Sequence, residues 1–83
     1  MLIDAFFSYI KITDWHNAVK ADKDYVSEYA KEKPKTEDIA ESLVSWMALR
    51  CHRSRQEPSS VDMITKRIPN RLKYFDRNLR LRC

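Results

Sequence analysis

The amino-acid sequence predicts a small all-α domain or fragment of three to five helices, with no sheet or at most one short extended segment. Its 83 residues contain no glycine. β-Hairpins and phosphate-binding turns use glycine to reach positive φ, so this composition disfavours both. Several segments space their apolar residues by three and four, which is the period of a helix. A chain of this length forms one helical unit over residues 1–83 with a modest core.

The N-terminal part predicts short elements. Residues 2–12 are apolar and are expected to form a short helix or strand. Asp14 is expected to cap a short helix over residues 15–21, in which His16 is interpreted as a surface or packing residue. Residues 25–30 fit either a helix or an extended segment. Pro34 ends this region, because the residue before a proline avoids the helical conformation.

The main helix is predicted over about residues 37–53, with Thr36 as its cap. Glu37 and Asp38 in the first turn suit the positive end of the helix dipole. At 100° per residue, seven side chains form an apolar side: Trp46, Ile39, Leu43, Met47, Ala40, Cys51 and Val44. Glu37 and Glu41 fall at the edge of that side, and the polar side holds Asp38, Ser42 and Ser45. A half-buried carboxylate needs an arginine, backbone donors or a metal ion as its partner.

The C-terminal third predicts two more helices. Residues 50–60 are polar and include Pro58, so they are expected to form the helix end and a loop. Ser59 or Ser60 is expected to cap the next helix. Pro69 fits the first position of a last helix, because its fixed φ suits that position. The final four residues are expected to fray.

The charge is divided unevenly along the chain. Residues 1–49 carry six Lys against nine Asp and Glu, and residues 50–83 carry eight Arg and two Lys against three acids. Every arginine lies at or after Arg50. Such a concentration can bind nucleic acid or an anionic membrane. We favour a simpler interpretation, in which the arginines form a solvated basic face or pair with acids elsewhere in a larger fold.

The two cysteines and the apolar N-terminal segment exclude several classes of protein. Cys51 and Cys83 permit one disulfide, but no C-x-x-C spacing of a structural zinc site is present. The apolar residues 2–10 are interrupted by Asp4 and have neither a basic start nor a cleavage site. We therefore interpret this segment as neither a signal peptide nor a membrane span.

Three segments, within about residues 15–79, resemble the C-terminal half of secreted zincin-like metallopeptidases of the gluzincin type. The first is Tyr25-Val26-Ser27-Glu28-Tyr29-Ala30. The second is Pro34 followed by Glu37-Asp38-Ile39-Ala40-Glu41-Ser42, and the third is Ile68-Pro69-Asn70-Arg71-Leu72-Lys73-Tyr74-Phe75-Asp76. A related E-x-x-A-E arrangement occurs in the anthrax lethal factor group. In gluzincins, two histidines of an H-E-x-x-H helix and a glutamate from a second helix hold a catalytic zinc.

The resemblance implies that Glu37 is the third zinc ligand and that Glu41, one turn later, orients a ligand histidine. The chain has no H-E-x-x-H, and its two histidines, His16 and His52, match no family position. We therefore expect a truncated or remnant peptidase that is inactive alone and binds no zinc by itself. Its expected partner is a missing N-terminal peptidase half or another protein.

The alternative is a small basic helical module that binds nucleic acid or a protein partner. Its support is the run of arginines from Arg50 onward, with Tyr74 and Phe75 among them. Against it, no helix-turn-helix pattern or platform for base stacking is visible.

Overall fold

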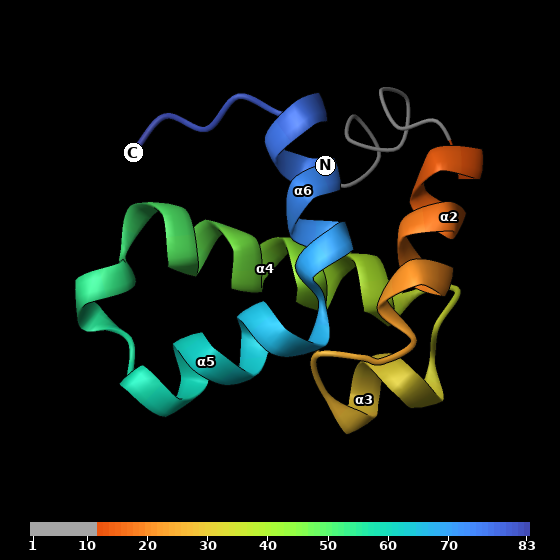
Figure 1. The fold of residues 1–83 in the computed structure, drawn as a ribbon, viewed down its shortest axis with the longest axis horizontal. Helices are drawn as coiled ribbons and strands as arrows, with labels where there is room; N and C mark the ends of the chain where they lie inside the picture. The colour runs from red at the N-terminus through yellow and green to blue at the C-terminus, as the bar shows by residue number, and fades with distance from the viewer. Residues whose placement is uncertain (1–11) are drawn as a thin grey trace.

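The computed structural model describes residues 12–83, and these residues are all-α, as predicted. They form α2 (Ile12–Asp22), α3 (Glu28–Glu32), α4 (Glu37–Cys51), the 3-10 turn η1 (Arg53–Arg55), α5 (Pro58–Arg67) and α6 (Pro69–Asn78) (Figure 1). No strand occurs in this range. The element expected at residues 2–12 lies outside the described residues, except for Ile12, the first residue of α2.

Helix α6 lies at the centre of the fold, in contact with α2, α4 and α5 (Figure 1). Ile68, Leu72 and Phe75 follow the helical spacing of four and three, so they lie on one side of α6 and are buried there. The core around them draws on α2, α3, α4 and α5, on Val26 before α3 and on Tyr74 of α6: Trp15, Ala18, Val26, Ala30, Ile39, Trp46, Leu49, Ile64 and Tyr74. Burial of this cluster therefore fixes the position of α4, which carries the candidate site.

The start of α4 agrees with the prediction, and two other helix starts do not. Thr36 precedes α4, although its side chain makes no capping hydrogen bond. Asp14 lies in the first turn of α2 rather than before it. Helix α5 begins at Pro58, ahead of both serines that were expected to cap it. Proline at the first helical position has no amide hydrogen to lose, which explains why α5 starts there.

The segment between α2 and α4 resolves the ambiguity over residues 25–30. Ser27 is extended, and its hydroxyl accepts a hydrogen bond from the amide of Ala30 at 3.1 Å, which opens the short helix α3. Lys23, just after α2, has a φ of 56°. That conformation normally suits glycine, so in a chain without glycine a lysine closes the helix with some backbone strain.

The expected frayed C-terminus is wrong. Cys83 forms a disulfide with Cys51 at the end of α4, with 5.2 Å between the two Cα atoms. Leu79 and Leu81 also pack against the core. The segment after α6 is thus held at both the core and the bridge. Within residues 12–83, no helix has the length and apolar character needed to cross a membrane.

Candidate functional site

Glu37 and Glu41 lie on the side of α4 opposite its buried side chains, and both are half-buried. The buried side chains of α4 are Asp38, Ile39, Ser42, Trp46 and Leu49. At 100° per residue these five form one side of the helix, and Val44, which is 64% exposed, lies opposite them. We call the residues on this opposite side the outer face of α4: Glu37, Ala40, Glu41, Val44, Met47 and Ala48. The outer face therefore combines two carboxylates with four apolar side chains.

Glu41 is held in place by the segment before α3. The Ser27 hydroxyl donates to Oε1 of Glu41 at 2.9 Å while it accepts the amide of Ala30. A hydroxyl can donate one bond and accept another, so the two contacts are compatible. This contact joins the first and second segments of the peptidase resemblance. It also orients the Glu41 carboxylate at the rim of a groove.

The groove beside Glu41 runs between α4, α5 and the turn at Val26. We call it the α4–α5 groove. Its walls are mostly apolar or hydroxyl side chains: Val26, Ser27, Val44, Ser45, Ala48, Gln56, Ser60, Met63 and Ile64. Glu41 is the single charged residue among those that line it. The groove therefore continues the outer face of α4 toward α5.

The described residues do not make a metal site by themselves. No group of three His, Cys, Asp or Glu side chains that could hold a metal ion occurs between residues 12 and 83. In the same range, no hydrogen bond or ion pair reaches the Glu37 carboxylate. His16 lies in α2 and His52 directly after α4. Glu37 and Glu41 thus share one side of a helix, and no third ligand from residues 12–83 joins them.

A buried ion cluster that the sequence reasoning missed lies on the inner side of α4. Nε and Nη2 of Arg71 donate to Oδ2 of Asp38 at 3.2 and 3.0 Å, and Nη1 donates to Oδ2 of Asp22 at 3.0 Å. The three side chains are almost fully buried. The guanidinium also lies over the rings of Tyr25 and Trp15, at 5.1 and 5.8 Å from their centroids. This cluster ties α2, α4 and α6 together.

Each member of the cluster makes further hydrogen bonds to neighbouring groups. Asp22 accepts the backbone amides of Asn70 and Arg71 at the start of α6, at 2.6 and 3.1 Å. Arg71 donates to the carbonyl of Asp24, and Ser42 donates to Asp38. Burial raises the pKa of Asp38 above its ordinary value, and the charge of Arg71 offsets part of that rise. Two carboxylates on one guanidinium leave a net negative charge, which is consistent with this direction.

The cluster corrects the predicted orientation of α4. Asp38 and Ser42 were placed on the polar, solvent side, yet both are buried. Val44 and Met47 were placed on the apolar side, yet they are 64% and 43% exposed. The helical wheel sorts residues by side-chain class alone. It therefore placed Asp38 on the solvent side, because it does not include the arginine of α6 that neutralises this carboxylate. The available signal was Arg71 itself, which shares a helical side with Ile68, Leu72 and Phe75.

The aromatic support for a nucleic-acid module is removed by the structure. Tyr74 and Phe75 are both fully buried. The Phe75 ring lies 5.4 Å from Trp15 and 5.5 Å from Trp46, centroid to centroid, and completes the aromatic core. Neither ring is available for stacking on a base. The basic residues after Arg50 remain as the support for that class.

The far end of α4 carries a second acidic contact. Arg50 donates from Nε and Nη2 to the two oxygens of Asp76 at 2.9 and 2.7 Å, and Trp46 donates to Oδ1 of Asp76 at 2.7 Å. Hydrogen bonds from Arg50 lower the pKa of Asp76 below its ordinary value. Because this pair is partly exposed, water screens it and it contributes modestly to stability.

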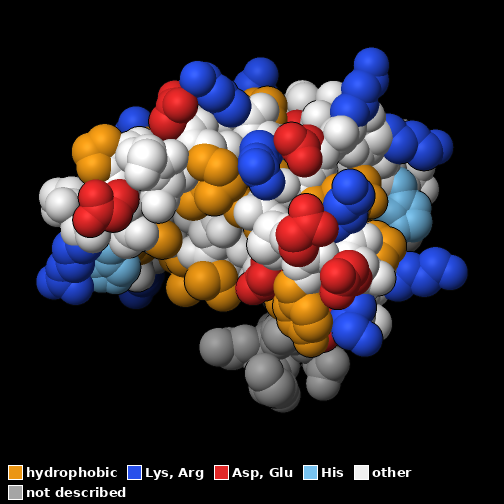
Figure 2. Space-filling model, turned by 90° about the horizontal axis from the view of Figure 1, so that it is seen from below, with side chains coloured by type: hydrophobic (Ala, Val, Ile, Leu, Met, Phe, Trp, Pro, Cys, Tyr) orange, Lys and Arg blue, Asp and Glu red, His pale blue; other side chains and the backbone are white. Residues whose placement is uncertain are grey.

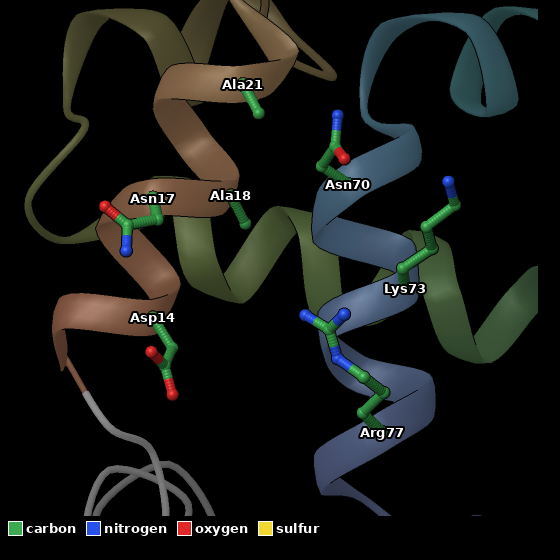
Figure 3. A pocket seen from close by; sticks show the side chains of 7 residues that line it. All are labelled: Asp14, Asn17, Ala18, Ala21, Asn70, Lys73 and Arg77. Atoms are coloured by element: carbon green, nitrogen blue, oxygen red, sulfur yellow. The ribbon is translucent and has the colours of Figure 1, made fainter.

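A further hollow lies between α2 and α6, away from Glu37 and Glu41. Figure 3 shows Asp14 and Asn17 on α2 across from Lys73 and Arg77 on α6, with the small side chains of Ala18 and Ala21 between the helices. The hollow is an open surface depression with mixed charge, and none of the predicted site residues lies in it.

No model of a protein family, no curated protein and no solved structure matches this chain.

Proposed function

We propose that this chain is the C-terminal portion of a zincin-like metallopeptidase domain, in which Glu37 is the glutamate ligand of a zinc site whose histidines lie on another segment. Glu41 positions one of those histidines. The chain alone is inactive. The observation that carries this proposal is the outer face of α4, which presents both carboxylates beside exposed apolar side chains.

The outer face has the composition of a surface that another helix covers. Val44 and Met47 are exposed although three other side chains of the same helix, Ile39, Trp46 and Leu49, belong to the core. Ala40 and Ala48 lie between and beside the carboxylates, and small side chains allow a second helix to approach closely. A helix with two histidines one turn apart would place both imidazoles along such a face.

The contact between Ser27 and Glu41 supports the role given to Glu41. An acid that orients a ligand histidine must itself be held, because a free carboxylate fixes no ring orientation. Ser27 donates to Glu41 from a position that its own bond with the Ala30 amide holds rigid. Within the described residues Glu37 has no such contact, so its carboxylate is available to bind a metal ion.

The described residues supply one candidate zinc ligand, Glu37, so no catalytic step is assigned to the chain. A catalytic zinc needs three protein ligands and an open position. Among the described residues Glu37 offers one ligand, and neither His16 nor His52 joins it in a group that could hold a metal. The proposal therefore depends on a second polypeptide segment that carries H-E-x-x-H.

The first experiment asks whether that segment exists. The DNA upstream of the codon for Met1 should contain a reading frame, within about a hundred codons, that encodes H-E-x-x-H. A domain contains roughly 100–200 residues, which sets this distance. The two polypeptides should then be produced together, purified as a complex, and assayed for bound zinc by atomic absorption.

Three variants of the full chain decide the ligand assignment. Glu37→Ala should abolish zinc retention by the complex, and Glu41→Ala should weaken zinc affinity by roughly 10–100-fold. Glu57→Ala removes a carboxylate directly before α5 that is not part of the outer face, and should leave the zinc content unchanged. Circular dichroism should show equal helix content in all three. Equal zinc content in the wild type and Glu37→Ala would overturn the assignment.

A further inference from the structure

The end of α4 and the C-terminal segment together form a concentrated basic surface. Arg53 and Arg55 lie in η1, and Arg80 and Arg82 lie in the segment after α6. The Cys51–Cys83 disulfide holds that segment beside the end of α4 (Figure 1). All four arginine side chains are exposed. His52, which lies between α4 and η1, is exposed as well. We call these five residues the arginine end.

The charges of the arginine end are mostly not neutralised. Within the described residues, Arg50 is the one arginine of this region that has a carboxylate within 4 Å, which belongs to Asp76. Arg53, Arg55, Arg80 and Arg82 have none. Figure 2 shows basic side chains grouped beside a histidine at the left end of the molecule, which is the end where α4 finishes in Figure 1. Four unpaired guanidinium groups on one small surface favour a polyanion as the partner.

We propose that the arginine end binds an extracellular sulfated polysaccharide. Guanidinium groups donate two parallel hydrogen bonds to an oxyanion, so closely placed arginines suit the repeated sulfate groups of such a polymer. Disulfides persist in oxidising compartments, where the abundant linear polyanions are sulfated polysaccharides rather than nucleic acids. The rings that would stack on bases, Tyr74 and Phe75, are buried, which disfavours single-stranded nucleic acid.

The disulfide has a defined part in this surface. Arg53 and Arg55 are separated from Arg80 and Arg82 by the whole of α5 and α6. Because the bridge joins Cys51 to Cys83, the two pairs are presented together to one stretch of polymer. Reduction leaves every charge in place but removes the covalent link at Cys83, so that only the packing of Leu79 and Leu81 holds Arg80 and Arg82 near the other pair. The affinity should therefore depend on the bridge as well as on the arginines.

Chromatography of the full, oxidised chain on immobilised heparin tests the proposal, with a salt gradient and a parallel titration of Kd. R53Q/R55Q and R80Q/R82Q should each weaken binding by about tenfold and lower the slope of log Kd against log salt by roughly 1–2. K33Q/K35Q removes two exposed charges near α3, at the other end of the molecule. That control should change Kd by less than about twofold.

Two further measurements keep the result unambiguous. C51S/C83S retains every arginine and should weaken heparin binding about fivefold, while circular dichroism verifies that it is folded. Equal binding by the wild type and C51S/C83S would overturn the role of the bridge. Equal losses in K33Q/K35Q and R53Q/R55Q would overturn the surface, because only net charge would then matter. Tighter binding of duplex DNA than of heparin at physiological salt would replace the polysaccharide with nucleic acid.

Discussion

Two acidic residues that follow each other in the sequence, Glu37 and Asp38, have opposite surroundings. Asp38 is 1% exposed and shares Arg71 with Asp22, whereas Glu37 lies on the outer face of α4 with no such partner in the described structure. On the inner side of α4, the charged side chain is paired and the apolar side chains are packed in the core. On the outer face, neither carboxylate has a basic side chain of the described residues within 4 Å, and Val44 and Met47 are exposed. For these two carboxylates, burial thus follows from an available counter-charge and not from the class of the side chain.

The largest effect should come from removing the cation of the inner side. Arg71→Ala leaves two buried carboxylates without a counter-charge, so the free energy of unfolding should fall by about 3–5 kcal/mol. A domain of this size has little stability to lose, so the variant should be largely unfolded. Urea denaturation followed by circular dichroism measures the change. Arg77→Ala, an exposed site on the same helix, should shift it by less than about 0.5 kcal/mol. Similar losses in both variants would contradict the buried cluster.

The two neighbouring acids themselves give the next largest difference. Asp38→Ala removes the hydrogen bonds to Arg71 and Ser42 and should lower the free energy of unfolding by about 2–3 kcal/mol. Arg71 keeps Asp22, which makes this loss smaller than that in Arg71→Ala. Glu37→Ala should change it by less than about 0.5 kcal/mol. If thermal melts show that Glu37→Ala is the more harmful change, the outer face has a partner that the contacts do not reveal.

A smaller effect should separate Glu41 from Glu37 on the outer face. Ser27→Ala removes both the cap of α3 and the contact with Glu41, and should destabilise the protein by about 1 kcal/mol. In a double-mutant cycle, Ser27→Ala and Glu41→Ala should show a coupling energy of at least about 0.5 kcal/mol. The matched cycle with Glu37→Ala should be additive. Additivity in both cycles would mean that Ser27 does not position Glu41.

The smallest effect concerns the dependence of stability on pH. Asp38 and Asp76 should change the free energy of unfolding in opposite directions as the pH falls. The pKa of Asp76 is lowered from 3.8, so its contribution to stability is present above that value and is lost as the pH falls through the folded pKa. The pKa of Asp38 is raised from 3.8, so its contribution improves as the pH falls through the folded pKa. Between neutrality and about pH 3, Asp76→Asn should therefore lose less stability than the wild type, by less than about 1 kcal/mol. Asp38→Asn should lose more, and a reversal of either difference would contradict the corresponding shift.

The fold was largely predictable because it depends on local signals. Absence of glycine, helical spacing of apolar residues and the prolines at 34 and 69 are visible along the chain, and the all-α prediction is confirmed. The starts of α4 and α6 also agree with those signals. Pro58 was assigned to a loop because a proline marks a loop and a first helical turn equally well.

The environment of the candidate site was less predictable because it depends on contacts between distant residues. Arg71 and Asp38 are separated by 33 positions, and nothing local to Asp38 indicates its burial. The disulfide likewise required the geometry of α4 and α6, since two cysteines fix no pairing geometry by themselves. The zinc-ligand role of Glu37 stays a prediction from resemblance, now with a position on the uncovered side of its helix.

The Cys51–Cys83 bridge also determines how the molecule would respond to a pulling force. It closes a covalent ring across 32 positions that contains both α5 and α6. When the chain is stretched from its two ends, the ring stays closed, so about 110 Å of contour length is withheld from extension. Within the described residues, the portion from α2 to the end of α4 can be drawn out, whereas α5 and α6 stay inside the closed ring. Under tension, the protein therefore extends by less than its residue count implies, because the ring closed by the disulfide carries α5 and α6 at one end.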